Sequence, residues 1–168
     1  MLFRSIMVMT PVHMAHVDVS LRLIGLVISV HVLGMYALSP LVGKIVDRFG
    51  RIQTILIGVI ILLASALISG LAYADAVVQL GIGLFLLGLG WSCTLIAGST
   101  LLAESLPAEI KASGQGLSDL SMNGGGALGG ALAGIVIAVS SYGWLCAIMA
   151  LPVLYLGAKA WRLRATSK

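Results

Sequence analysis

Long apolar segments, separated by short polar turns, occupy most of the chain. A membrane-spanning helix needs about 20 apolar residues. Four segments meet that length and a fifth is slightly shorter: 23–43, 52–74, 76–103, 115–138 and 142–160. A further apolar stretch, at residues 2–15, is shorter still and is interrupted by Arg4 and Pro11. The pattern predicts six spans, the first of them short, in a single transmembrane domain over residues 1–168.

The stretch at residues 2–15 has two interpretations. One is a signal peptide, although no small-x-small cleavage site follows it. The other is the remaining half of a spanning helix whose beginning is absent from the chain. Only the side of the membrane on which Arg4 falls depends on the choice.

The composition indicates lipid as the solvent. Of 168 residues, 60% are hydrophobic and 10% charged, with a mean hydropathy of +1.11, whereas soluble domains carry about 25% charged residues. A soluble domain of this length cannot cover so much apolar surface. Cys93 and Cys146 lie in apolar segments, so we expect small buried hydrophobes. The sequence therefore predicts an all-α integral membrane protein that contacts the bilayer, with no metal, cofactor or nucleic acid.

Positive charge gathers at one end of the predicted spans. If all six cross, nine of the ten Lys and Arg residues fall on one side and only Arg22 on the other. Because Lys and Arg are enriched in cytoplasmic loops, we expect the side with nine to face the cytoplasm, together with both termini. The expected location is a bacterial plasma membrane. The nine are Arg4, Lys44, Arg48, Arg51, Lys111, Lys159, Arg162, Arg164 and Lys168.

The turn between the second and third spans carries a recognisable motif. It has the form Gly-x-x-x-Asp-Arg-x-Gly-Arg, at Gly43, Asp47, Arg48, Gly50 and Arg51. The two glycines suit a sharp turn, because glycine tolerates backbone conformations that other residues avoid. This motif resembles the signature loop of the major facilitator superfamily of secondary transporters.

Two further segments resemble the same family. Residues 103–114 hold Glu104, Pro107 and Lys111 in a pattern like the family's Glu-x-x-Pro…basic…Gly loop, and a glycine-rich helix follows at 115–134. Family members have twelve helices in two six-helix halves, so the resemblance implies one half-bundle here. The fourth span lacks an arginine and the fifth lacks a Gly-Pro pair, which favours the C-terminal half, truncated at its start. Such a half requires a second six-helix half or a homodimer.

The charged residues at the cytoplasmic end are candidates for a gate. The resemblance implies that Asp47 holds a helix end of the opposite half in one state, and its position also suits capping of the third span. Arg48 and Arg51 are placed to pair with Asp47 or Glu104, and Lys111 brackets the other loop. A network that forms in one state biases a two-state equilibrium. The alternative is a solvated turn whose charges only fix the orientation.

Asp119 is the principal candidate for the transport path. It lies well inside a predicted span, about 12 Å of helical rise beyond Lys111. An aspartate at the centre of a span costs about 2.5–3.5 kcal/mol, so it should face the bundle interior or water. Gln115, Met122 and Asn123 share its face by their spacing. The hypothesis is a protonatable or cation-contacting site; the alternative is an interfacial aspartate paired with a basic residue.

Two other mid-span residues are weaker candidates for the path. His31 has an unperturbed pKa of about 6.5, which suits proton transfer, but such a histidine more often hydrogen-bonds a neighbouring helix. Trp91 is unusual in mid-span, since tryptophan prefers membrane interfaces. It is a candidate to line a cavity.

Glycines recur every fourth residue along the predicted fifth span. Gly126, Gly130 and Gly134 form a small-xxx-small face, which predicts close helix packing. The same segment is no phosphate-binding loop, because it is embedded in an apolar span.

Two functional hypotheses follow. The first is half of a carrier that moves a small solute by alternating access, with proton coupling left open. The second is a truncated membrane remnant or interaction subunit that transports nothing. An enzyme is not expected, because no catalytic pair occurs at helical spacing, and no substrate is indicated.

Overall fold

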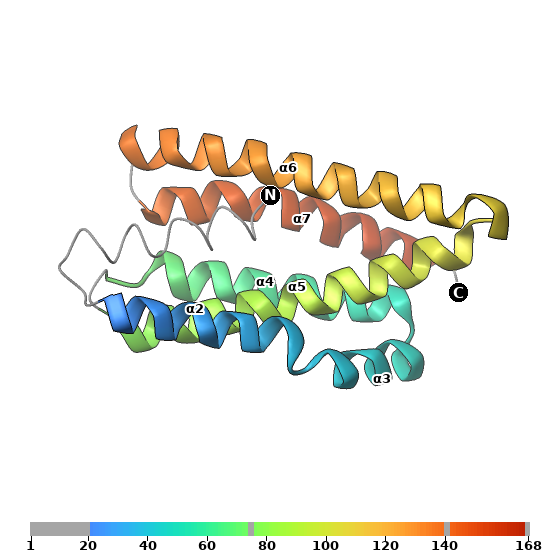
Figure 1. Cartoon of the computed structure of the whole chain (residues 1–168), viewed down its shortest axis with the longest axis horizontal. Coiled ribbons are helices and arrows are strands. Elements are labelled where there is room, and N and C mark those ends of the chain that lie inside the picture. Colours follow the sequence, from blue (N-terminus) through green and yellow to red (C-terminus); the bar gives the residue numbers. More distant parts are fainter. Residues whose placement is uncertain (1–20, 74–75, 140–141, 167–168) are drawn as a thin grey trace.

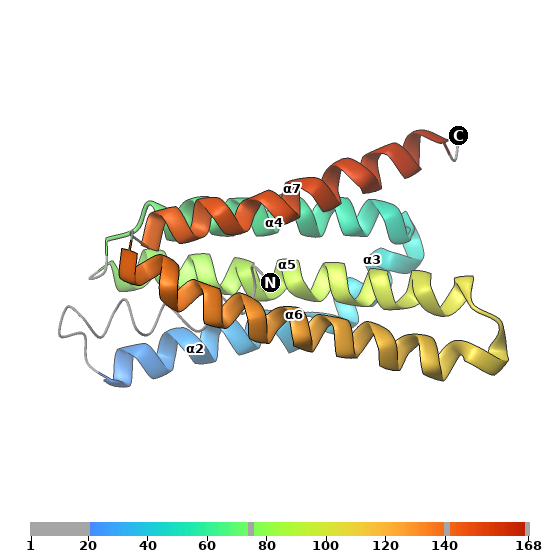
Figure 2. The ribbon, with the colours of Figure 1, turned by 90° about the horizontal axis from the view of Figure 1, so that it is seen from above.

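The computed structural model describes residues 21–73, 76–139 and 142–166, and all regular structure in these ranges is helical. The helices run along one long axis, with α6 as the outermost helix in Figure 1 and with α4 and α7 along one edge in Figure 2. The predicted first span, at residues 2–15, lies outside the described residues. The elements are α2 (Leu21–Tyr36), α3 (Ser39–Phe49), α4 (Arg51–Gly70), α5 (Val77–Ser105), η1 (Ala108–Ile110), α6 (Lys111–Val139) and α7 (Tyr142–Thr166).

Four helical segments in the described residues are long and apolar enough to cross a membrane. They are Arg22–Phe49, Arg51–Gly70, Val77–Ser105 and Trp144–Leu163. Helix α6 has the necessary length, at 29 residues, but its first half is polar and glycine-rich. These helices confirm the predicted all-α membrane architecture.

The segment that contains α2 and α3 is broken once, between Tyr36 and Ser39. Pro40 occupies the first turn of α3, where its missing N–H and fixed φ are tolerated but would interrupt a continuous helix. Beyond this break α3 continues to Phe49, so Gly43 is helical and does not form part of a turn.

The sharp turn between α3 and α4 is confined to Gly50. This residue has φ +90°, a left-handed conformation that side chains disfavour. Its N–H donates to the carbonyl of Val46, 2.9 Å away, and its own carbonyl accepts from the Thr54 hydroxyl at 2.9 Å. The expectation that Asp47 caps the next helix is wrong: Gly50 is the N-cap of α4, with no side-chain hydrogen bond. Asp47 lies inside the last turn of α3, which continues past the expected helix end.

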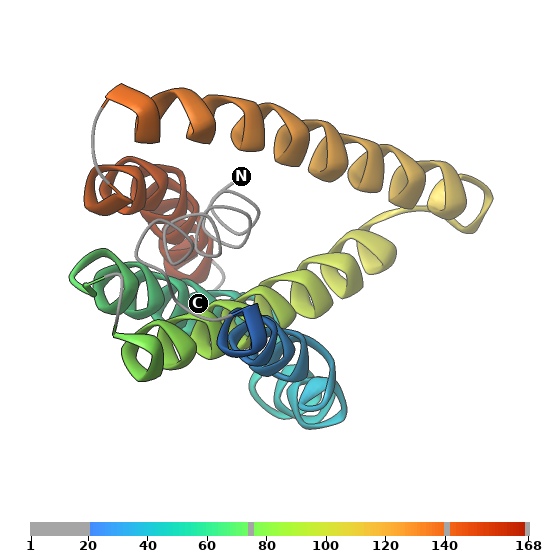
Figure 3. The same cartoon turned by 60° about the vertical axis from the view of Figure 1, so that its left-hand side comes forward.

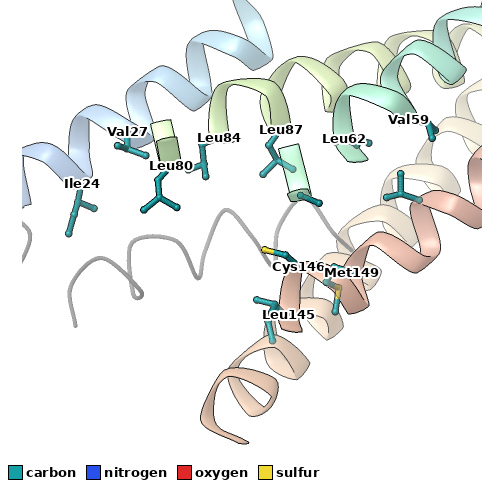
Figure 4. Packing of buried hydrophobic residues seen from close by; sticks show 13 residues of the cluster. Ile24, Val27, Val59, Leu62, Leu80, Leu84, Leu87, Leu145, Cys146 and Met149 are labelled. Carbon is teal, nitrogen blue, oxygen red and sulfur yellow. The ribbon is translucent and has the colours of Figure 1, made fainter. Parts of the chain in front are cut away.

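Helix α5 is the centre of the bundle. Leu80, Leu84 and Leu87 on α5 are fully buried, and Figure 4 shows them between side chains of α2 and α4, with α7 close by. The same cluster includes Val27, Leu62, Cys146 and Met149. Cys93 and Cys146 are both buried, which confirms the expectation of small buried hydrophobes.

Close helix packing occurs at glycines of α2, α4 and α5. A Cβ added at Gly34 would lie 2.6 Å from the backbone oxygen of Phe85, and one at Gly58 would lie 3.0 Å from that of Gly90. A methyl group at either position collides with backbone, which cannot move aside as a side chain can. The main chains of α2 and α4 therefore approach α5 as closely as glycine permits.

Helix α6 packs on this core toward its C-terminal end, where Ala133 is fully buried in the same cluster, and diverges from it along the rest of its length. It is joined to α5 at one end and turns toward α7 at the other, as Figure 3 shows. A Cβ at Gly130 would meet nothing within 4 Å, so the described helices do not pack on that position. That Gly126, Gly130 and Gly134 pack against another helix stays a prediction.

We expect Gly34→Ala to destabilise the protein by about 1–3 kcal/mol, because the new methyl group would overlap the Phe85 backbone. The measurement is reversible unfolding in mixed micelles as the fraction of sodium dodecyl sulfate rises. Gly25→Ala is the matched control on the same helix, since a Cβ there meets nothing within 4 Å. It should be neutral or stabilising by up to about 1 kcal/mol. Equal losses for the two variants would contradict the close approach.

Candidate functional site

A cavity of about 910 Å³ lies between α6 and the rest of the bundle. Helix α6 diverges from α5 and leaves an open space. Residues of α2, α4 and α7 line the other side of this space, so five helices contribute to its wall. The lining residues are Met35, Tyr36, Leu62, Trp91, Thr94, Leu95, Gly98, Ser99, Gln115, Ser118, Asp119, Met122, Gly126, Pro152, Val153 and Leu156.

One face of α6 supplies the polar wall of the cavity. Gln115, Ser118, Asp119 and Met122 recur at three- and four-residue spacing and all line it. Among the lining residues Asp119 is the one formally charged side chain. The oxygen Oε1 of Gln115 is buried without a hydrogen-bond partner in the described part of the chain. The cavity thus offers the Asp119 carboxylate, and beside it lies an amide oxygen that has no hydrogen-bond partner among the described residues.

Asn123 shares this helical face in sequence but does not line the cavity. Its Nδ2 donates a hydrogen bond of 2.8 Å to the backbone carbonyl of Asp119, one turn earlier. The amide therefore supports the helix beside Asp119.

The opposite wall is aromatic and apolar. Trp91 on α5 and Tyr36 at the end of α2 form an edge-to-face pair, with ring centroids 6.3 Å apart and planes at 72°. Thr94 lies one turn along α5, and its hydroxyl donates to the Gly90 carbonyl at 3.1 Å. The structure thus brings Trp91, Gln115 and Asp119 to one cavity.

Sequence reasoning missed Tyr36 and Pro152 in this wall. Pro152 lies inside helix α7, and a proline within an apolar span is a local signal of an irregular backbone. Tyr36 gave no comparable signal, because its contact with Trp91 depends on how α2 crosses α5.

His31 is placed away from the cavity. It is fully buried between α2 and α5, and its Nδ1 donates a hydrogen bond of 2.7 Å to the Leu84 carbonyl. This is the interhelical arrangement that the sequence offered as the alternative to a proton path.

At the charged end of the bundle, Arg51 and Glu104 form an ion pair. Arg51 begins α4 and Glu104 lies in the last turn of α5, so the pair connects the two helices beside the Gly50 turn. Arg48 instead lies over the Phe49 ring, 5.7 Å from its centroid. In the described ranges neither Asp47 nor Lys111 forms an ion pair, and both are exposed.

Within residues 21–73, 76–139 and 142–166, no three His, Cys, Asp or Glu side chains come close enough to hold a metal ion. The chemistry available in the cavity is therefore that of one carboxylate, an amide, hydroxyls and aromatic rings.

Comparison with known proteins decides the family. The profile of the Major Facilitator Superfamily matches residues 1–167. The chain belongs to this superfamily. It is therefore an integral, multi-pass membrane protein of a family of transporters.

Curated relatives agree with this membership. The chain is 42% identical to the uncharacterized MFS-type transporter YddS of Bacillus subtilis, over 84% of this chain and 33% of the relative. The chain is 38% identical to the uncharacterized MFS-type transporter YdeG of the same organism, over 89% of this chain and 36% of the relative. The riboflavin transporter RfnT of Brucella anthropi is 31% identical, over 85% and 35%. The chain spans about a third of the length of these relatives.

We expect Arg51 and Glu104 to be energetically coupled, by up to about 1 kcal/mol, because both side chains remain partly exposed. A double-mutant cycle with Arg51→Gln and Glu104→Gln, followed by the same unfolding assay, measures this coupling. The control cycle pairs Glu104→Gln with Lys111→Gln and should be additive within about 0.5 kcal/mol. Additive losses in both cycles would show that the Arg51–Glu104 contact contributes nothing.

Proposed function

We propose that this chain forms one half of a secondary transporter, and that the cavity beside Asp119 is part of the path of a small solute. The observation that carries the proposal is the meeting of Asp119, Gln115 and Trp91 in one cavity of a chain that belongs to a transporter family. A carboxylate in a membrane span is costly, so its position beside a cavity favours a functional role.

Transport by alternating access requires two bundles around a site near the middle of the membrane. We infer that a second six-helix half, or a second copy of this chain, supplies the missing wall. Helix α6 supports this inference, because large apolar side chains along it are exposed: Leu117, Leu120, Leu128, Leu132 and Ile135. The alternative is that the chain has no such partner and is a remnant that does not transport.

The gate in this proposal lies at the charged end. Arg51 and Glu104 already connect α4 to α5, while Asp47, Arg48 and Lys111 are exposed at the same end and available to a partner bundle. Contacts that form in only one state would bias the equilibrium between inward- and outward-open forms. The excess of Lys and Arg supports a cytoplasmic location for this end and for both termini, and the relatives from Bacillus support a bacterial plasma membrane.

The lining of the cavity favours an organic cation as the solute. Asp119 supplies the one formal charge among the lining residues, and Trp91 and Tyr36 offer aromatic faces. Cations are attracted both to a carboxylate and to the face of an aromatic ring, more strongly when water is excluded. Proton exchange at Asp119 is the second role compatible with this position.

If the cavity is a water-filled path, a cysteine at Ser118 should react with a membrane-impermeant methanethiosulfonate reagent. The background would replace Cys93 and Cys146 with alanine. Leu117→Cys is the matched control, because it is the neighbouring position and does not line the cavity. We expect labelling of Ser118→Cys to be faster by about tenfold or more, a difference of about 1.4 kcal/mol in activation free energy. Equal rates would remove the cavity from the transport path.

We expect Asp119→Asn to abolish concentrative uptake of tetraphenylphosphonium by the assembled transporter in proteoliposomes, because it removes the charge that attracts the cation. Glu109→Gln is the control, since Glu109 is exposed in η1 and outside the cavity. Vesicles that contain only this polypeptide as a monomer should show no uptake. Uptake by the monomer, or full uptake by Asp119→Asn, would contradict the proposal.

A further inference from the structure

A second concavity, of about 610 Å³, lies between α4 and α7 and shares no lining residue with the cavity. We call it the α4/α7 groove. In Figure 2 these two helices lie along one edge of the bundle, with α2 and α6 along the other. The lining residues on which its chemistry depends are Gln53, Ile57, Ile60, Gly157, Trp161 and Arg162.

The floor of the groove is set by a close contact between the two helices. A Cβ at Gly157 would lie 2.9 Å from Cγ1 of Val59. Because glycine leaves this place open, α7 approaches α4 closely here, and the side chains on either side rise as the walls. The groove therefore results from the close packing of α4 and α7 at this glycine.

The walls change from polar to apolar along the direction of the helices. Gln53 and Arg162 lie at the end where α4 begins, and Ile57 and Ile60 follow toward the middle of α4. Ile60 lies seven positions after Gln53 in the helix, which corresponds to about 10 Å of rise. The polar end is also the positively charged end of the protein, where Arg51 and Lys159 lie.

Trp161 marks the depth of the polar end in the membrane. Its side chain is 62% exposed although it belongs to an apolar helix. Tryptophan side chains favour the level of the lipid headgroups, where one part of the ring is in an apolar environment and the N–H is near water. The polar end of the groove therefore suits the headgroup layer, and the apolar end suits the hydrocarbon.

We propose that the α4/α7 groove binds an anionic glycerophospholipid of the same leaflet. The lipid phosphate pairs with the Arg162 guanidinium and accepts a hydrogen bond from the Gln53 amide, and an acyl chain lies over Ile57 and Ile60. Arg162 is the one charged side chain among the lining residues. A positive charge next to an apolar slot at the membrane interface fits a lipid with net negative charge better than a zwitterionic one.

The experiment uses Trp161 as the reporter, in a Trp91→Phe and Trp144→Phe background, reconstituted in phosphatidylcholine vesicles. Part of the lipid is replaced by brominated phosphatidylglycerol or by brominated phosphatidylcholine at the same mole fraction. Bromine quenches tryptophan fluorescence on contact, so quenching reports which lipid occupies the groove. We expect the apparent affinity for the brominated phosphatidylglycerol to be higher by about fivefold.

Three variants identify the residue responsible. Arg162→Gln should reduce quenching by phosphatidylglycerol to that by phosphatidylcholine, whereas Arg162→Lys should retain most of the preference. Lys159→Gln is the matched control, because it removes the same charge from the same helix but does not line the groove. Unchanged quenching by phosphatidylcholine shows that each variant keeps its fold around Trp161.

Each of the following outcomes would overturn the proposal. Equal quenching by the two lipids in the Trp161 reporter background, with Arg162 and Lys159 unchanged, would show a general lipid-facing surface. A preference that survives Arg162→Gln, or that Lys159→Gln removes equally, would show unspecific attraction to the charged end. Absence of quenching by either lipid would show that a protein surface, such as a second copy of this chain, covers the groove. Inorganic phosphate in the buffer should leave the quenching unchanged, and a loss of quenching would identify a free-anion site.

Discussion

The arrangement of this bundle depends on how closely the backbone of α5 is approached from two sides. Lipid supplies no hydrophobic force between helices, so packing relies on close van der Waals contact and on polar groups that bond across the interface. Gly34 and Gly58 provide the close contact. The hydrogen bonds from His31 to Leu84, 2.7 Å, and from Ser65 to Gly83, 2.7 Å, cross the same two interfaces.

The position of α6 follows from its composition, which differs from that of the apolar helices α2, α4 and α5. Its first half is rich in polar residues and glycine, so it has little apolar surface with which to pack against α5. Divergence from α5 places Asp119 beside an open volume, where the charge can be solvated or matched by a ligand. The polar composition that weakens the packing of α6 on the other helices thus also places a charged side chain beside the cavity.

The sequence was informative where one helix or one loop was sufficient to decide. Apolar length predicted the membrane helices, the glycine–aspartate–arginine spacing indicated the family, and three- and four-residue spacing placed Gln115 and Asp119 on one face. It was less informative where two helices must be aligned with each other. The Tyr36–Trp91 contact, the withdrawal of His31 from the cavity and the close approach at Gly34 all depend on the crossing of α2 and α5. The failed cap of Asp47 has a different origin, since apolar patterning does not reveal that α3 continues to Phe49.

The single residue between α3 and α4 gives the charged end a mechanical property. A one-residue connection leaves no slack, so a tilt of α3 displaces the start of α4 instead of being absorbed by a loop. Arg51 follows Gly50 directly and is paired with Glu104, which lies in the last turn of α5. The end of α3, the start of α4 and the end of α5 are therefore joined through one backbone residue and one ion pair.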